Sequence, residues 1–452
     1  MDFYQINLAV FASTNAYLLY RQFQKGKKTA PDFTLVDPTS IEHAEKEELS
    51  GTARRFQINY FLPYALAVAA DWLQGPHIYA IYKYEKNIPE RTVAALYAAG
   101  FVSGGISASF AGGLADRFGR KRACLLYCGL YIATCLSMLS DDLLILFLGR
   151  LCGGVCTTLL FSVFEAWMIS EYHARGLEGS GLDLSMVFGN MTTISCVVAI
   201  MSGIVGDVLV EFSGTRTWPF LAAAFCCVAS AYLISIIWKE NYGSQSAEQT
   251  SMADLKSGVL AIVRDAKILS LSITSCFFEG TMYLFIFFWS AALKSARTQS
   301  GSDEDLPFGL IFSSFMCAMM AGSAIFTLRS SANDSQSMSS MLMIVTLLVS
   351  CCLSFSAVVQ NEHLLFWALC LLEGCVGAYF PSMASLKSEL IEDGIRGRVY
   401  SILRFPLNVF VVVAHSLDEE GDAHRNHVFL VCSALLLVAF LAARRQFNGK
   451  SY

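Results

Sequence analysis

Apolar stretches of about 20 residues recur from one end of the chain to the other, with short polar segments between them. A helix of that length crosses the hydrocarbon core of a bilayer, where a backbone must satisfy its own hydrogen bonds. Charged residues make up 15% of the 452 residues, against about 25% in a soluble domain. The sequence therefore predicts an all-α membrane protein and excludes a soluble globular one.

The spacing of these stretches predicts one extra helix followed by two groups of six. The predicted spans are 3–20, 56–80, 92–113, 123–140, 143–167, 183–209, 218–238, 267–293, 307–328, 338–360, 363–385, 396–416 and 427–443. The polar segment 239–266 separates the two groups. We therefore expect the following parts: an extra N-terminal transmembrane helix with a cytosolic loop (1–55), two six-helix bundles (56–238 and 267–443), a central cytosolic loop (239–266) and a cytosolic tail (444–452).

Two bundles joined by a polar loop are typical of a transporter built from two related halves. With these boundaries, about 23 Lys and Arg residues lie on the side of the 21–55 loop and the C-terminus, and about 7 on the other side. Positive residues concentrate in cytosolic loops, so the C-terminus is predicted to be cytosolic. The first twenty residues begin with Met1-Asp2 and lack a basic n-region and a cleavage site, so the first span is predicted to be retained.

The chemistry-bearing motifs of enzymes are missing from the sequence. It contains no phosphate-binding P-loop, nucleophile elbow or H-E-x-x-H motif. The net charge of −5 without long like-charge runs predicts no nucleic-acid partner. Most cysteines fall inside apolar runs, and the C-x3-C pair Cys152 and Cys156 has no neighbours that complete a metal site. We predict no enzyme activity, no cofactor and no metal site, and energy taken from a gradient.

A short basic segment follows the predicted second helix of the first bundle. Residues 112–122 read GGLADRFGRKR. Glycines permit a tight turn, cations hold a loop in the cytosol, and a carboxylate can pair with a nearby arginine or accept helix-end amides. We predict a conformational latch formed by Asp116, Arg117, Gly119 and Arg120; the alternative is a basic loop that only sets orientation. The corresponding segment 328–334 lacks the pattern, so the latch is expected in one half only.

Six ionisable side chains lie well inside the predicted spans: Asp71, Arg150, Glu165, Glu279, Glu373 and Arg404. A charge at a helix centre costs about 2.5–3.5 kcal/mol on insertion scales, so these groups should face a cavity or one another. At about 1.5 Å per residue, Glu279, Glu373 and Arg404 fall near mid-depth. Arg150 falls near the outer side and Glu165 near the inner side. For each acid the alternative is a structural ion pair or a helix cap.

Arg404 is the strong cation that this spacing places near mid-depth. Asn408 and His415 follow it at i+4 and i+11, on one stripe of the predicted helix. A guanidinium fork suits two oxygens of a tetrahedral oxyanion, which favours an anionic substrate.

Helical spacing adds neutral partners to the other charges. Gln74 shares a face with Asp71, Tyr283 shares one with Glu279, and Asn190 is the candidate counterpart of Asn408 in the first half. The predicted substrate-binding residues are Arg404, Asn408, Asn190, Tyr283, Gln74 and Arg150.

The six buried groups carry two more negative than positive charges, which would repel a dianion. Burial and neighbouring negative charge both favour the protonated carboxyl. We therefore predict proton-coupled symport, with the coupling carried by Asp71, Glu279, Glu373 and Glu165. The alternatives are a proton-coupled exporter of organic cations, which an acidic interior also suits, and a sensor that binds an anion without moving it.

Several motifs together resemble the major facilitator superfamily. Segment 112–122 matches the superfamily's G-x-L-A-D-R-x-G-R-K/R loop, 149–154 (GRLCGG) its fourth-helix motif, and 396–398 (RGR) the entry to its eleventh helix. Further strings resemble the molybdate-anion transporter branch, which has an additional N-terminal helix. They are AADWLQGP at 69–76, FSVFEAW at 161–167, GLIFSSFM at 309–316, YFPSM at 379–383 and RFPLN at 404–408.

The resemblance implies a major facilitator fold and high-affinity import of molybdate, a tetrahedral oxyanion, by alternating access. It further implies a multi-pass protein of the plasma membrane. Protons, expected from the excess of buried acids, and the lipid bilayer are the other predicted partners, and we expect a monomer. The substrate comes from the resemblance and not from composition or spacing.

Overall fold

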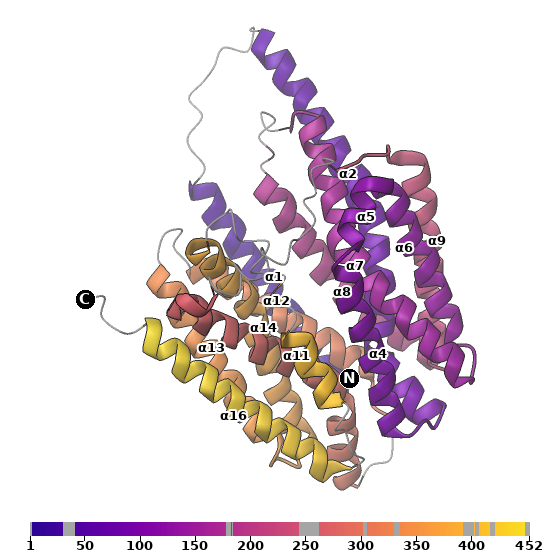
Figure 1. The fold of residues 1–452 in the computed structure, drawn as a ribbon, viewed down its shortest axis with the longest axis vertical. Coiled ribbons are helices and arrows are strands. Elements are labelled where there is room, and N and C mark those ends of the chain that lie inside the picture. Colours follow the sequence, from indigo (N-terminus) through magenta and orange to yellow (C-terminus); the bar gives the residue numbers. More distant parts are fainter. Residues whose placement is uncertain are drawn as a thin grey trace. The chain divides into compact units, whose positions relative to one another are not determined.

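The computed structural model describes residues 2–29, 41–177, 182, 184–243, 262–301, 305–329, 335–391, 402, 406–415 and 421–447 of the chain. This part of the chain is almost entirely helical and contains no strand (Figure 1). The predicted all-α class is therefore confirmed. Each predicted span overlaps a helix of the structure, although the predicted span 396–416 is described mainly through the helix Pro406–His415.

The chain forms two compact units. The C-terminal unit contains Met1–Gln24, Tyr82–Phe101 and Glu248–Tyr452, and the N-terminal unit contains Lys25–Ile81 and Val102–Ala247. The first helix of the chain thus belongs to the unit formed by its last helices. The assignment of 56–238 and 267–443 to two six-helix bundles stays a prediction.

The N-terminal unit is built from long helices around an aromatic core. Its elements are α2 (Ile41–Gln74), η1 (Gly75–His77), α3 (Ile78–Ala80), α5 (Ala111–Phe118), α6 (Arg120–Ser137), α7 (Leu143–Ala174), α8 (Leu184–Ser213) and α9 (Thr217–Ile237). Helix α2 packs on α8 and α9, and α6 packs on α7 and α9. Tyr60, Phe164 and Trp167 are almost fully buried, which fits the aromatic-rich inner faces of these helices.

The C-terminal unit contains α1 (Phe3–Thr29), η2 (Ile81–Glu85), most of α4 (Glu90–Ala108), α11 (Ala266–Gln299), α12 (Phe308–Arg329), α13 (Ser335–Ser356), α14 (Glu362–Leu390), α16 (Asp422–Phe447) and the helix Pro406–His415. Helix α14 packs on α12 and α13, and α16 packs on α11 and α13. A Cβ at Gly322 would overlap the carbonyl group of Gly374, and one at Gly377 would overlap that of Met319. Small residues thus let α12 and α14 approach backbone to backbone.

Helix α1 is fastened to the C-terminal unit by polar and aromatic contacts. The hydroxyl of Tyr4 donates a hydrogen bond to Glu362 at the start of α14, and the Phe3 ring stacks on His363 at 3.8 Å. The side chain of Asn15 donates to the carbonyl of Cys317 on α12 at 2.8 Å. The predicted extra helix therefore forms part of the packing around α12 and α14.

Eight described helices are long and apolar enough to cross a membrane: α7, α8, α9, α11, α12, α13, α14 and α16. The pair α4 and α5, bent by 52°, makes a ninth if it forms one span. The other predicted spans coincide with α1, α2, α6 and the helix Pro406–His415. The apolar helices agree with a multi-pass membrane protein.

Two local expectations need correction. The segment 112–122 is mostly helical and not a loop, because α5 runs from Ala111 to Phe118 and includes both glycines of the pair 112–113. The turn falls on Gly119 alone, whose φ of 112° is one that residues with a side chain rarely adopt. Helix α14 also continues to Leu390, five residues beyond the predicted end at 385, and this extension brings Lys387 onto the helix.

Candidate functional site

The predicted latch lies in the N-terminal unit, at the turn between α5 and α6. The Arg120 guanidinium donates to the Asp116 carboxylate at 2.7 Å and to the carbonyl of Ala166 on α7 at 3.0 Å. The carbonyl of Asp116 also accepts from the backbone N–H of Gly243, which follows α9, at 3.1 Å. Asp116 and Arg120 thus join α5, α6, α7 and the segment after α9.

Glu240 of the same segment completes this network. Its carboxylate accepts from the backbone N–H of Lys121 at 2.8 Å and lies 3.8 Å from the Arg122 guanidinium. A Cβ at Gly119 would lie 2.7 Å from Glu240 Oε1, and one at Gly243 would lie 2.6 Å from Asp116 Oδ1. Both positions therefore need glycine, because a larger residue would displace a carboxylate of the network.

Trp167 and Trp238 hold the segment after α9 in place. Their rings stack at 3.8 Å, and Trp167 Nε1 donates to the carbonyl of Lys239 at 2.9 Å. Trp238 Nε1 donates to the carbonyl of Asn59 on α2 at 2.9 Å. The remaining predicted latch residue, Arg117, lies over the ring of Phe118 at 5.5 Å.

A second polar cluster of the N-terminal unit surrounds Asp71 near the end of α2. Tyr131 on α6 donates a hydrogen bond to Asp71 Oδ1 at 3.1 Å, and the side chain of Gln74 donates to the Tyr131 hydroxyl. The positive charge of Arg150 on α7 acts on the Asp71 carboxylate. The structure therefore brings together three predicted site residues, Asp71, Gln74 and Arg150, with Tyr131, which sequence reasoning missed.

Two further predicted residues of this unit stand apart from the Asp71 cluster. Glu165 on α7 is half-buried and interacts electrostatically with Tyr60 and Tyr64 of α2. Asn190 is half-buried on α8.

In the C-terminal unit, Glu279 of α11 lies in a cluster of hydrogen-bond donors. Its Oε1 atom accepts from the hydroxyl of Ser275 at 2.6 Å and from the hydroxyl of Tyr379 on α14 at 3.1 Å. The ammonium group of Lys387, also on α14, lies 3.9 Å from the same oxygen and donates to Ser275 Oγ at 3.0 Å. Glu279 therefore forms an ion pair within a helix bundle, which is the alternative kept for each buried acid, and its partner Lys387 was not predicted.

Lys387 was missed because the predicted span ended two residues before it. The helical spacing still held a signal, because Tyr379 and Lys387 are eight residues apart and therefore share one face of α14. A helix continued by one more turn would have placed a cation on the face that carries Tyr379.

Other predicted residues of this unit are buried or half-buried. Glu373 on α14 is 6% exposed and forms no ion pair with a residue in the described part of the chain. His415 is 3% exposed and packs against Tyr97, Phe101 and Phe287. The ring of Tyr283 lies 4.8 Å from that of Phe101.

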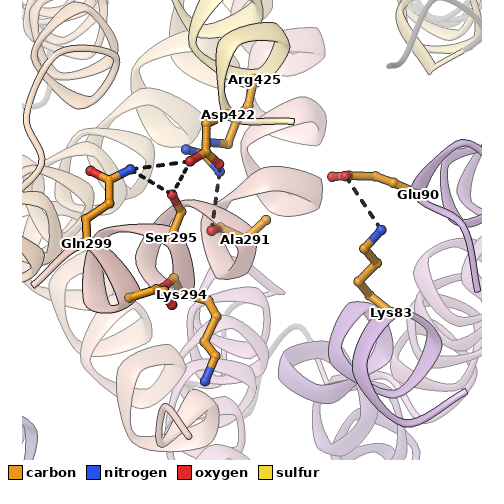
Figure 2. A network of polar contacts seen from close by, with 9 residues as sticks. Lys83, Glu90, Ala291, Lys294, Ser295, Gln299, Asp422 and Arg425 are labelled. Atoms are coloured by element: carbon orange, nitrogen blue, oxygen red, sulfur yellow. Dashed lines mark hydrogen bonds and ion pairs between the residues drawn. The ribbon is translucent and has the colours of Figure 1, made fainter. Parts of the chain in front are cut away.

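A separate network joins the far end of α11 to the start of α16 (Figure 2). Asp422 accepts from the hydroxyl of Ser295 at 2.6 Å and pairs with Arg425 at 2.9 Å. Arg425 also donates to the carbonyl of Ala291 at 3.3 Å. Figure 2 further shows the ion pair between Lys83 and Glu90, 3.9 Å apart. Both sets of contacts fasten helix ends, and the contacts at Ala291 and Ser295 lie 12 and 16 residues along α11 from Glu279.

Comparison with known proteins decides the family. A family model described as sugar transporters with 12 transmembrane helices matches residues 39–371. The molybdate-anion transporter of Xenopus tropicalis is 32% identical over 398 residues, covering 86% of this chain and 85% of the relative. That of Danio rerio is 30% identical over 430 residues, covering 86% of each chain. The chain belongs to the molybdate-anion transporter family of the major facilitator superfamily.

Solved structures agree with the major facilitator fold predicted for the chain. The nucleoside transporter NupG superposes with a TM-score of 0.65 at 15% identity, covering 89% of this chain and all of that one. A D-xylose-proton symporter gives a TM-score of 0.65 at 12% identity, covering 88% of this chain and 99% of that one. As a member of the major facilitator superfamily, the protein is a multi-pass membrane transporter.

Among the predicted site residues of this major facilitator transporter, Arg404 and the motif 396–398 lie outside the described residues. Asn408 is described and half-buried on the helix Pro406–His415. A surface hollow of about 620 Å³ beside α6 and α7 is lined by residues such as Ala133, Leu136 and Cys152 and by none of the predicted site residues. The polar clusters described above are therefore the candidate sites.

Proposed function

We propose that the protein imports molybdate by alternating access, driven by protons that enter with the anion. The observation that supports molybdate as the substrate is the match to molybdate-anion transporters over 86% of the chain. The plasma membrane as location, a cytosolic C-terminus and a monomeric state belong to the same proposal. The substrate is bound by Arg404, Asn408, Asn190, Tyr283, Gln74 and Arg150.

The chemistry of the described clusters supports an anion as substrate. Molybdate carries two negative charges, so its entry into an apolar site needs cations and hydrogen-bond donors. The C-terminal unit offers the Lys387 ammonium with the hydroxyls of Ser275 and Tyr379. In the N-terminal unit, Gln74 and Tyr131 offer donors near the positive charge of Arg150.

The buried carboxylates support proton coupling through Asp71, Glu279, Glu373 and Glu165. Glu373 is the clearest case, because it is 6% exposed and pairs with no cation among the described residues. An ionised carboxylate without a partner is costly in an apolar interior, so the neutral form is favoured there. Protonated carboxyls remove the repulsion that an entering dianion would meet.

Asp116, Arg117, Gly119 and Arg120 form the latch in this proposal. The network around Asp116 and Glu240 ties the α5–α6 turn to α7 and to the segment after α9. Breaking it changes the balance between conformational states, since its bonds hold one arrangement of these elements. The latch acts on the rate of cycling and not on substrate affinity.

Labelled molybdate uptake by the purified protein in proteoliposomes tests the proposal. An inward proton gradient should drive accumulation, and an uncoupler that collapses the gradient should stop it. Unlabelled sulfate, another tetrahedral oxyanion, serves as a competitor that measures selectivity. Uptake that ignores both pH and the gradient would remove proton coupling from the proposal.

A second candidate is a proton-coupled exporter of organic cations. The observation that favours it is an excess of acids inside the predicted spans. The four acids Asp71, Glu165, Glu279 and Glu373 outnumber the two cations Arg150 and Arg404. Such an exporter would leave molybdate outside the vesicles and release a preloaded organic cation when the proton gradient is applied. A sensor would bind labelled molybdate without accumulating it.

A further inference from the structure

The Glu279 cluster differs from the other ion pairs described in the C-terminal unit. Four pairs lie near helix ends: Lys83–Glu90, Lys294–Asp305, Arg297–Glu362 and Arg425–Asp422. Glu279 instead lies well inside α11, which runs from Ala266 to Gln299. An ion pair in this position costs more to desolvate than one at a helix end, so a role beyond fastening helices would explain its presence.

Three donors converge on one atom of the cluster. Ser275, Tyr379 and Lys387 all approach Oε1 of Glu279, at 2.6, 3.1 and 3.9 Å. Lys387 also donates to Ser275 Oγ at 3.0 Å. The Glu279 oxygen therefore occupies the position at which an oxygen of another anion would meet the same three donors.

Exposure separates the charged groups from their neutral neighbours. The side chains of Lys387 and Glu279 are 15% and 23% exposed, whereas Ser275 and Tyr379 are buried. The charged pair thus lies partly open at the edge of the packing between α11 and α14, while the two hydroxyls are fixed within it.

Among the residues that the structure describes, Lys387 is the cation that faces Glu279 from the neighbouring elements. On α11 itself, Cys276 interacts electrostatically with Glu279. On the helix Pro406–His415, Leu407 and Phe410 cover Gly280, while His415 contacts Phe287, about two turns further along α11. The charged residues of α16 that contact α11, Asp422 and Arg425, lie still further on, at Ala291 and Ser295.

We propose that Lys387, Ser275 and Tyr379 form an oxyanion-binding site whose charge Glu279 controls. The ionised Glu279 neutralises Lys387 and occupies the site. A proton taken up by Glu279 removes that neutralisation, and the ammonium and the two hydroxyls then bind an oxygen of the anion. This inference rests on the proposed function, because it gives the proton and the anion one shared position.

Equilibrium binding of labelled molybdate to the detergent-solubilised protein, measured from acidic to alkaline pH, tests the site. The wild type should bind more tightly as the pH falls, since acid protonates Glu279. Lys387→Met should weaken binding by about tenfold or more at every pH, because a charged hydrogen bond is lost, while Lys387→Arg should keep much of the affinity. Glu279→Gln should bind tightly with little dependence on pH.

Two further variants keep the test independent of folding. Glu279→Gln/Lys387→Met removes both charges of the pair together, so it should reach the membrane and melt like the wild type while binding weakly. Lys294→Met/Asp305→Asn removes an exposed lysine–acid pair of the same unit and should leave binding unchanged. Wild-type affinity in Lys387→Met, or an unchanged pH profile in Glu279→Gln, would overturn the site.

Failure of this inference and failure of the proposed function give different results. If the wild type accumulates molybdate and Lys387→Met binds it normally, the Lys387 site is wrong and the transport function stands. Repeating the binding series with sulfate tests the site without molybdate. A wild type that binds neither anion overturns both.

Discussion

Asp71 and Glu279 are two carboxylates to which we assign proton coupling. Their surroundings hold them in different ways. Asp71 in the N-terminal unit accepts from the neutral hydroxyl of Tyr131, with Arg150 acting on it electrostatically. Glu279 in the C-terminal unit has a direct cation, Lys387, 3.9 Å away. A proton on Asp71 therefore changes a hydrogen bond, whereas a proton on Glu279 also releases a positive charge.

The difference suggests a division of labour between the two units. In the mechanism that we propose, the C-terminal unit couples the proton to the charge of the anion, and the N-terminal unit adjusts hydrogen bonding and carries the latch. Further substitutions test this division, beginning with the largest expected effect.

Arg404→Ala should abolish uptake of labelled molybdate, with a loss of about 100-fold or more. The physical reason is the loss of a two-pronged charged contact, in which each hydrogen bond contributes about 1.5–3 kcal/mol. Arg404→Lys should also fail largely, because the fork geometry is lost. Normal uptake by Arg404→Ala, with equal amounts of protein in the membrane, would leave Lys387 as the principal cation of the C-terminal unit.

Asp71→Asn should lower proton-driven uptake by roughly tenfold while leaving exchange of labelled for unlabelled molybdate in place. The amide keeps the volume of the carboxylate but cannot take up the proton. Tyr131→Phe is the matched control, because it removes the hydrogen bonds of the hydroxyl with Asp71 and Gln74, each worth about 1 kcal/mol, and leaves the carboxylate. If Asp71→Asn retains full proton coupling, the N-terminal unit takes no part in it.

Asp116→Asn should slow cycling by about fivefold and leave the Kd for molybdate unchanged. The substitution weakens the contact with Arg120 from a charged to a neutral hydrogen bond. Lys239→Ala is the control. Lys239 is exposed, and its backbone carbonyl, which alanine keeps, accepts the hydrogen bond from Trp167. Uptake rates and equilibrium binding measured on the same preparation separate the two quantities, and a lost affinity in Asp116→Asn would argue against a latch.

Tyr4→Phe should have the smallest effect, a fall in the melting temperature of roughly 2 °C. The substitution removes the hydrogen bond to Glu362, which fastens α1 to α14, the helix that carries Lys387. Molybdate binding should stay close to that of the wild type. A large loss of binding in Tyr4→Phe would mean that α1 positions α14 and does more than stabilise it.

Local spacing predicted the fold class and part of each cluster. Apolar stretches located the helices, and the i, i+3 relation placed Asp71 and Gln74 on one helix face, where both contact Tyr131 in the structure. The pairing of Asp116 with a nearby arginine was also correct. These features depend on residues close together in the sequence, so periodicity is enough to find them.

The missed residues depend on contacts between distant segments. Tyr131 reaches Asp71 from 60 positions away, Glu240 reaches Lys121 from 119, and Lys387 reaches Ser275 from 112. A residue-by-residue pattern carries no information on such pairs. The predicted end of α14 at 385 fell short of Lys387, although the long apolar stem of a lysine allows it to lie along a helix and extend its charge to a partner.

The central claim is that protons drive molybdate into the compartment they enter. Proteoliposomes that hold the wild-type protein, with an acidic outside and a neutral inside, test it directly through labelled molybdate accumulation over time. We predict accumulation above the external concentration that collapses when an uncoupler removes the gradient. Equal label on both sides in the presence of the gradient, or no entry of label at all, would contradict the account.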